Sequence, residues 1–350
     1  MSVSFGTFAA ALGGNPLLAV TALLTLGVVF VNGWTDAPNA IATCVSTRSM
    51  PPRAAIGMAA VLNFAGILVM TAVNATVAET IYHMVDFGGD AGAAGTALCA
   101  AMTAIVLWAV LAWYFGIPTS ESHALIAGLS GAAIALRGGM AGIQGDAWVR
   151  VLYGLALSAA LGFGFGFLAG KLTSLAAARG DRRRTNRWFR GAQVFAGAGS
   201  AFLHGAQDGQ KFLGVFLLGI SLARGQADAS SFRIPFWLML LCSATMSLGT
   251  SIGGYRIIKA VGMSMVRLEA HEGFAADLAA SACLLLSSLG GLPVSTTHTK
   301  TTAMMGVGAA RRLRGVNWSV AREMALAWVL TFPGCGLIGW LTARLFLRIF

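Results

Sequence analysis

Two short motifs, each present twice, bring together residue types that bind small ions. The first runs Asn32-Gly-Trp-Thr-Asp-Ala-Pro-Asn39 and recurs as His204-Gly-Ala-Gln-Asp-Gly-Gln-Lys211, with its Gly-x-x-Asp core displaced by 172 positions. The second runs Gly116-Ile-Pro-Thr-Ser-Glu-Ser-His123 and recurs as Gly291-Leu-Pro-Val-Ser-Thr-Thr-His298, displaced by 175 positions. Two different motifs that recur in the same order at nearly the same offset indicate an internal duplication.

The hydroxyl residues of the second motif suit a small anion. Pro118 and Pro293 are each followed by Ser and Thr at positions typical of a helix N-cap. A half-helix that begins there presents free N–H groups and the positive end of its dipole. Two such ends that face each other form a cradle for a tetrahedral oxyanion. The candidate substrate-binding residues are Ser120, Ser122, Ser295, Thr296, Thr297, Asn39 and Gln207.

The carboxylates of the first motif suit a cation. Asp36 and Asp208 lie at equivalent positions inside apolar stretches, where a carboxylate is costly unless it is paired or coordinates an ion. With Asn39 and unwound backbone carbonyls they could ligate a hard monovalent cation, or they could carry a proton. We therefore expect a coupling cation, Na+ or H+, and no cofactor or structural metal.

Several polar residues in or next to the same motifs have more than one possible role. His123 and His298 either hold the hairpin geometry through a backbone carbonyl or handle a proton. Glu121, which has Thr296 as its counterpart, is a candidate for the same two roles and is expected to face water at the hairpin tip. Lys211 and Lys300 could attract the anion, snorkel, or neutralise a neighbouring carboxylate. Gln210 is expected at the same site.

The composition requires a membrane to position these residues. Hydrophobic residues make up 57% of the 350-residue chain and charged residues only 11%, against about 25% in soluble domains. The 45 glycines fit closely packed membrane helices. We attribute the net charge of +11 to basic residues in cytoplasmic loops rather than to nucleic-acid binding. The five cysteines, all in apolar stretches, are expected to be small buried hydrophobes.

Apolar stretches long enough for membrane helices divide the chain into two similar halves. They are expected near residues 16–48, 54–78, 93–116, 118–136, 148–172, 190–223, 233–254, 275–292, 294–310 and 322–347. Residues 1–178 form the first transmembrane repeat, 179–190 a cytoplasmic basic linker, and 191–350 the second repeat. With the motifs at residues 118 and 293 as tips of re-entrant hairpins, each half crosses the membrane an odd number of times. The predicted fold is therefore an all-α polytopic membrane protein, with inverted repeats, broken helices and re-entrant helical hairpins.

At these motifs the sequence resembles the inorganic phosphate transporters of the Pit-type permease family. The duplicated family signature, similar to Gly-Ala-Asn-Asp-x-x-Asn-Ala, is matched by Gly33–Ala40 and by His204–Lys211, and the family's Pro-x-Ser-x-x-His motif by both hairpins. The resemblance implies phosphate held by Ser120, Ser122, Ser295, Thr296 and Thr297, with Asp36, Asn39 and Asp208 serving the coupling cation. Thr35 and Gln207 stand where the family usually has Asn, which leaves the ion and the exact substrate open.

The hypothesis is import of inorganic phosphate by cation symport, with alternating access around a site at the membrane midplane. The alternatives are a permease for another tetrahedral oxyanion such as sulfate, and an anion channel. An enzyme is not expected, because the hairpin Ser and His residues are not set in a GxSxG motif and the sequence has no HExxH or CxxC motif. We expect an integral protein of a prokaryotic plasma (inner) membrane in contact with lipid. A homodimer and a cytoplasmic regulator that docks on the basic linker are left open.

Overall fold

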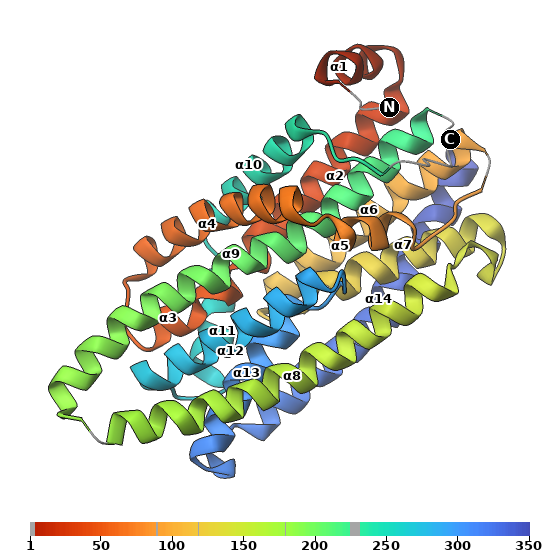
Figure 1. Cartoon of the computed structure of the whole chain (residues 1–350). Helices are drawn as coiled ribbons and strands as arrows, with labels where there is room; N and C mark the ends of the chain where they lie inside the picture. Colours follow the sequence, from red (N-terminus) through yellow and green to blue (C-terminus); the bar gives the residue numbers. More distant parts are fainter. Residues whose placement is uncertain (1–3, 89, 118, 179, 225–231) are drawn as a thin grey trace.

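The computed structural model describes residues 4–88, 90–117, 119–178, 180–224 and 232–350, and Figure 1 shows their arrangement. Regular structure in these residues is helical, apart from two isolated backbone bridges. The α-helices are α1 (Phe5–Gly14), α2 (Pro16–Thr35), α3 (Ala42–Ser46), α4 (Pro52–Val73), α5 (Thr76–Tyr82), α6 (Ala91–Phe115), α7 (Glu121–Arg137), α8 (Gly145–Ala178), α9 (Arg182–Ala223), α10 (Phe236–Ile252), α11 (Tyr255–Ser264), α12 (Ala270–Leu289), α13 (Thr296–Arg311) and α14 (Trp318–Ile349). Short 3-10 helices cover Ala37–Ile41, Met140–Gly142 and Leu313–Gly315.

Several of these helices are long and apolar enough to cross a membrane. In the described residues six spans qualify, and a seventh is possible if α10 and α11, which are bent by 74° relative to each other, form one span. The predicted apolar stretches agree with the helices to within a few residues at most ends. The chain is therefore an integral membrane protein with a helical fold, as its composition predicts.

The first copy of the Asp motif breaks its helix, whereas the second copy does not. Helix α2 ends at Thr35, and a 3-10 helix carries Pro38 before α3 begins. Proline cannot donate the N–H bond of an α-helix and clashes with the carbonyl four residues earlier. The second copy contains no proline, and α9 continues through His204–Lys211 without a break. The expectation of a break in the second half was wrong for this reason.

The basic segment between the halves is shorter than the sequence suggests. Asp181 caps α9 by accepting bonds from the N–H groups of Arg183 and Arg184, so most of the expected linker 179–190 is the first turns of a helix. Arg179 lies outside the described residues. In Figure 1 the adjoining ends of α8 and α9 lie at lower left, and the two chain termini lie at the opposite end of the molecule.

The helices of the second half follow the order of those in the first, and the two sets interlock. Each half has a hairpin helix, α7 or α13, whose N-cap serine accepts a bond from the N–H of a histidine three residues on. A backbone bridge spans each hairpin: Val85 pairs with Ile143, and Val266 with Val316. Helix α7 packs on α14 of the other half, and α13 packs on α8; likewise α2 packs on α10, and α9 on α4. This exchange makes each half complete the core of the other.

Close backbone contact holds α9, which carries the second Asp motif, against α4. A Cβ atom built on Gly66 of α4 would lie 1.9 Å from the carbonyl oxygen of Phe202, and one on Gly205 would lie 2.4 Å from that of Asn63. Neither helix can take a side chain at these positions without moving apart. Small residues at such contacts are how membrane helices gain packing energy in lipid.

We predict that Gly66→Ala destabilises the folded protein, whereas Gly57→Ala on the same helix does not. The methyl at position 66 meets backbone, and overpacking of this kind costs about 1–3 kcal/mol. Gly57 is exposed and has nothing within 4 Å of a built Cβ. Its change to Ala is neutral or stabilises the helix by up to about 1 kcal/mol. Thermal unfolding of both purified variants in detergent measures the difference; equal midpoints would contradict the contact.

Candidate substrate and cation site

The two hairpin tips meet inside the protein. Ser120 caps α7 by accepting a bond from the N–H of His123, and Ser295 caps α13 in the same way through His298. The Oγ atoms of the two serines are 2.7 Å apart, and the residues are 1% and 0% exposed. The predicted encounter of the two tips is therefore present, although Pro118 itself lies outside the described residues.

Each tip leaves backbone donors at its helix N-terminus. The first residues of an α-helix have N–H groups without an intrahelical acceptor. Here these are Glu121 and Ser122 on α7, and Thr296 and Thr297 on α13. Because Ser120 contacts Ser295, the positive ends of both helix dipoles converge on one region. A small oxyanion is the ligand that such a region stabilises best.

The carboxylates of Asp36 and Asp208 lie directly against the second tip. The Thr296 hydroxyl lies 3.1 Å from Asp208 Oδ2 and 3.3 Å from Asp36 Oδ2, so it bridges the two acids. The Thr297 hydroxyl donates to Asp36 Oδ1 at 2.5 Å. Asn32 Nδ2 lies 3.3 Å from Asp208 Oδ2. The hairpin hydroxyls thus connect the anion cradle to the acidic pair.

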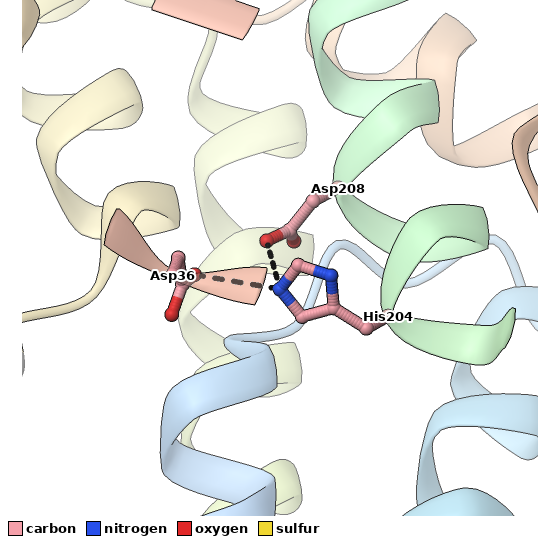
Figure 2. A group of neighbouring side chains, drawn as sticks. All are labelled: Asp36, His204 and Asp208. Carbon is pink, nitrogen blue, oxygen red and sulfur yellow. Dashed lines mark ion pairs between the residues drawn. The ribbon is translucent and has the colours of Figure 1, made fainter. Parts of the chain in front are cut away.

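His204 lies beside the two carboxylates, although it was not named as a site residue from the sequence. Its Nε2 atom lies 3.4 Å from Asp208 Oδ2 and 3.9 Å from Asp36 Oδ2, as Figure 2 shows. Its Nδ1 atom contacts Asn63 Oδ1 at 3.2 Å. One ligand atom from each of the three residues falls within 4.8 Å of the others, close enough to share a cation. The available signal was its spacing: His204 precedes Asp208 by one helical turn.

Two amides that contact the aspartates have buried oxygen atoms without hydrogen bonds. Asn32 lies against Asp208 and Asn39 against Asp36, and among the described residues the side-chain oxygens of both are buried without a hydrogen-bond partner. A buried polar atom left unpaired is costly, so its presence at a site suggests a ligand. Amide and carboxylate oxygens are ligands for hard cations. The predicted cation residues Asp36, Asn39 and Asp208 therefore lie in a setting that can hold one.

Lys211 neutralises a carboxylate, one of the roles considered for it. Its ammonium group lies 2.6 Å from each of three acceptors: Asp208 Oδ1, Ser122 Oγ and the carbonyl oxygen of Val294. The residue is 1% exposed. It therefore neither snorkels nor faces solvent, and its contacts join α9 to both hairpin tips.

Glu121 does not face water at the tip, contrary to the sequence-based expectation. It is 3% exposed, and its Oε1 atom accepts a bond from the Thr35 hydroxyl at 3.1 Å. The tip itself is buried against the other hairpin, so a residue at its first helical position has no route to solvent. Glu121 is thus a further acidic group close to the site.

The two tip histidines pack against each other and against α14. Their ring centroids are 4.3 Å apart, and His298 stacks on Trp328 at 3.7 Å. His123 Nδ1 lies 3.3 Å from the Trp328 carbonyl oxygen and its ring packs on Phe332. This geometry favours the supporting role over proton handling, a choice that remains our prediction.

The side chains of the remaining predicted residues, Gln207 and Gln210, contact connecting segments rather than the acidic pair. Gln207 Nε2 donates to the carbonyl of Leu292, ahead of the second tip, and Gln210 Nε2 donates to the carbonyl of Asn74. Both are completely buried. They fix α9 relative to the neighbouring connections, and the Gln207 oxygen remains unpaired.

A second buried ion pair, between Lys300 and Asp277, lies outside the predicted site. Asp277 also accepts a bond from the Thr43 hydroxyl at 2.6 Å, and Lys300 donates to the Ala40 carbonyl at 2.9 Å. The pair ties α13 to α12 and to the broken segment after α2. Asp277 was missed although a carboxylate in an apolar stretch is itself a signal.

We predict that breaking this pair from one side costs far more than removing it whole. Asp277→Leu or Lys300→Met leaves an uncompensated buried charge, which costs about 3–5 kcal/mol of folding stability, whereas the double variant loses less than either single variant. Arg137 and Asp86, which pair at 2.7 Å while 36% and 41% exposed, provide a control that costs at most about 1 kcal/mol. Thermal unfolding of the single and double variants tests this, and a double variant that loses as much stability as either single variant would contradict it.

Comparison with known proteins gives a consistent result. A model of the phosphate transporter family matches residues 32–179 and 170–339. A "Probable low-affinity inorganic phosphate transporter" of Bacillus subtilis (strain 168) is 36% identical over 326 residues, covering 92% of this chain and 96% of the relative. A protein of the same description from Rhizobium meliloti (strain 1021) is 35% identical over 323 residues, covering 92% and 94%.

A solved structure described as "The sodium-dependent phosphate transporter" has the same fold, with a TM-score of 0.85 at 22% identity. The match covers 96% of this chain and all of that one. All of these proteins are described as transporters, not enzymes. The chain belongs to the phosphate transporter family.

Proposed function

We propose that this protein imports inorganic phosphate together with a monovalent cation, either H+ or Na+. The observation that carries the proposal is the meeting of two helix N-termini at Ser120 and Ser295, directly against the paired carboxylates of Asp36 and Asp208. The descriptions of the relatives support phosphate as the substrate. The name of the similar structure supports Na+ as one of the two candidate ions.

Phosphate is proposed to lie between the tips, where hydroxyl and backbone donors converge. Ser120 and Ser295 now bond to each other, and a bound oxyanion would replace that contact with charge-assisted bonds, which are stronger. The free N–H groups of the first turns of α7 and α13 would complete the cradle. At neutral pH phosphate still carries hydroxyl groups, and the nearby carboxylate oxygens of Asp36 and Asp208 are suitable acceptors for them. Sulfate, the alternative substrate, has no proton to donate.

The coupling follows from electrostatics. An oxyanion that enters beside two carboxylates is repelled, and repulsion between buried charges is only weakly screened. A cation bound by Asp36, Asn39 and Asp208 would offset this repulsion. Each ligand then increases the affinity of the other, because such coupling is reciprocal. Each is therefore expected to bind more weakly alone than in the presence of the other.

Transport requires the site to open, because its residues are sealed in this structure. Asp36, Asp208 and the four tip residues Ser120, Ser295, Thr296 and Thr297 are each at most 3% exposed. We propose that the two halves are inverted repeats and that they rock about the site to give alternating access. An open anion channel would instead need a continuous pore. The central basic segment is proposed to face the cytoplasm of a prokaryotic cell, with the protein in its plasma membrane.

The first test is uptake of radiolabelled phosphate by proteoliposomes that contain the purified protein. We expect saturable uptake that depends on a Na+ gradient or a proton gradient and persists in excess unlabelled sulfate. The gradient that drives uptake identifies the ion. Absence of phosphate uptake, or its loss in sulfate, would overturn the substrate assignment. Non-saturable flux that no cation gradient alters would favour the channel.

Substitutions at the tips separate substrate binding from coupling. Ser120→Ala and Ser295→Ala each remove a hydroxyl that donates to a charged ligand, which is worth about 1.5–3 kcal/mol or roughly a 10- to 100-fold rise in KM for phosphate. Asp208→Asn is expected to abolish gradient-driven uptake. Ser251→Ala, at an exposed position on α10, is the matched control and should transport normally. Unchanged KM in both tip variants would place the phosphate elsewhere.

A further inference from the structure

The first half of the chain builds a small oxygen-rich group around Asp36. Asn39 Nδ2 lies 2.6 Å from Asp36 Oδ1 and 3.3 Å from the hydroxyl of Thr297. That hydroxyl also contacts Asp36 Oδ1 at 2.5 Å and lies 3.4 Å from the carbonyl oxygen of Thr119. The Asn39 side-chain oxygen is buried and has no hydrogen-bond partner. A carboxylate, an amide, a hydroxyl and a backbone carbonyl therefore meet at one point.

The second half builds the same group around Asp208, with one substitution. Lys211 Nζ lies 2.6 Å from Asp208 Oδ1 and 2.6 Å from the hydroxyl of Ser122. The Ser122 hydroxyl lies 3.4 Å from the carbonyl oxygen of Val294, which the lysine also contacts. Carboxylate, hydroxyl and carbonyl recur, and an ammonium stands where the first half has an amide.

The correspondence holds residue by residue in the sequence. The pairs Asp36/Asp208 and Asn39/Lys211 keep the offset of the first motif, and the pairs Ser122/Thr297 and Thr119/Val294 keep the offset of the second. The two groups are thus related by the duplication. They differ in charge at a single position, where a neutral amide is replaced by a cation.

The oxygens around Lys211 are those that a hard monovalent cation prefers. Backbone carbonyls of irregular segments and carboxylates are the usual ligands of coupling ions in membrane transporters. An ammonium group has three N–H donors, and these meet three oxygens at 2.6 Å, so none is left for a further ligand. The group is 1% exposed and cannot exchange with solvent ions in this state.

We propose that the Lys211 ammonium is a tethered cation, which fills the second of two equivalent cation positions and removes the need for a coupling ion there. Lys211 is then a determinant of ion number: it leaves the Asp36 and Asn39 position for a free cation and occupies the Asp208 position permanently. This inference rests on the proposed coupling of phosphate transport to a cation. It predicts that a neutral, shorter residue at 211 converts the position into an ion site.

The test measures ion binding without transport. Lys211→Asn copies the first half into the second, and Lys211→Ala vacates the position without adding a ligand. Each variant, purified in detergent without phosphate, is unfolded thermally across a series of NaCl concentrations, with choline chloride holding ionic strength constant. In excess Na+, the slope of stability against the logarithm of concentration is proportional to the number of ions bound only by the folded state.

We expect the slope for Lys211→Asn and Lys211→Ala to exceed that of the unmodified protein by the contribution of one ion, a twofold rise if the unmodified protein binds one. Lys211→Met is the matched control, because its side chain removes the charge but still fills the space; its slope should not rise. Lys259→Asn, at an exposed position on α11, controls for loss of a lysine elsewhere. An unchanged slope in both test variants, or an equal rise in Lys211→Met, would overturn the proposal.

Two further outcomes are decisive. If the test variants fold in NaCl but not in choline chloride, the ion replaces the ammonium and the proposal is supported. If they fold in neither salt, a free cation cannot take the place of Lys211, and the proposal fails. The binding measurement is independent of phosphate uptake. A protein that moves no phosphate but gains the ion in Lys211→Asn would therefore refute the proposed function while supporting the tethered cation.

Discussion

Two buried carboxylates near one another in a membrane protein impose the constraint on which the site depends. Asp36 and Asp208 are 2% and 1% exposed and share the hydroxyl of Thr296. Such a pair is stable only if positive charge or donors surround it. The hairpin hydroxyls and Lys211 supply them, and each comes from an element that must be held in place. The capped tips, the close α4–α9 contact and the exchange of helices between halves can all be understood as meeting this requirement.

The proposed duplication accounts for a site that is built twice, and small sequence differences explain why the two copies are unequal. Pro38 breaks the first Asp helix, which allows Asn39 and the following backbone to turn toward the second tip. Helix α9 lacks a proline and remains continuous, so the residue equivalent to Asn39 keeps its helical position. A long side chain there spans the gap to the first tip, and that residue is Lys211. The first half thus reaches the opposite tip through a break in its backbone, whereas the second half reaches it with a longer side chain.

The sequence alone was sufficient to predict the features that depend on the length of apolar stretches and on the spacing between repeated motifs. Apolar stretches predicted the helices, and the repeated motifs predicted that the tips and both aspartates would converge. It was insufficient where the outcome depends on three-dimensional neighbours. Glu121 is polar at a predicted tip, and only the contact between tips shows that it is buried. His204 and Asp277 have no equivalent at the matching positions of the other half, so a search for repeated residues passes over them. The continuous helix α9 shows that a shared motif does not ensure a shared backbone when only one copy contains proline.

The charges at the site bear on why transport would be coupled at all. Asp36 and Asp208 contribute two carboxylates, and Lys211 provides one ammonium within hydrogen-bonding distance of Asp208. The ammonium also contacts both tips, so it lowers the electrostatic cost for an anion that arrives between them. It cannot be released with the substrate, however, because it is part of the chain. In the proposed mechanism the exchangeable positive charge therefore belongs to the group around Asp36, where the side-chain oxygen of Asn39 is unpaired. A fixed cation at one position would supply part of the electrostatic stabilisation that bound phosphate needs. The transport cycle would still require a free ion at the other position.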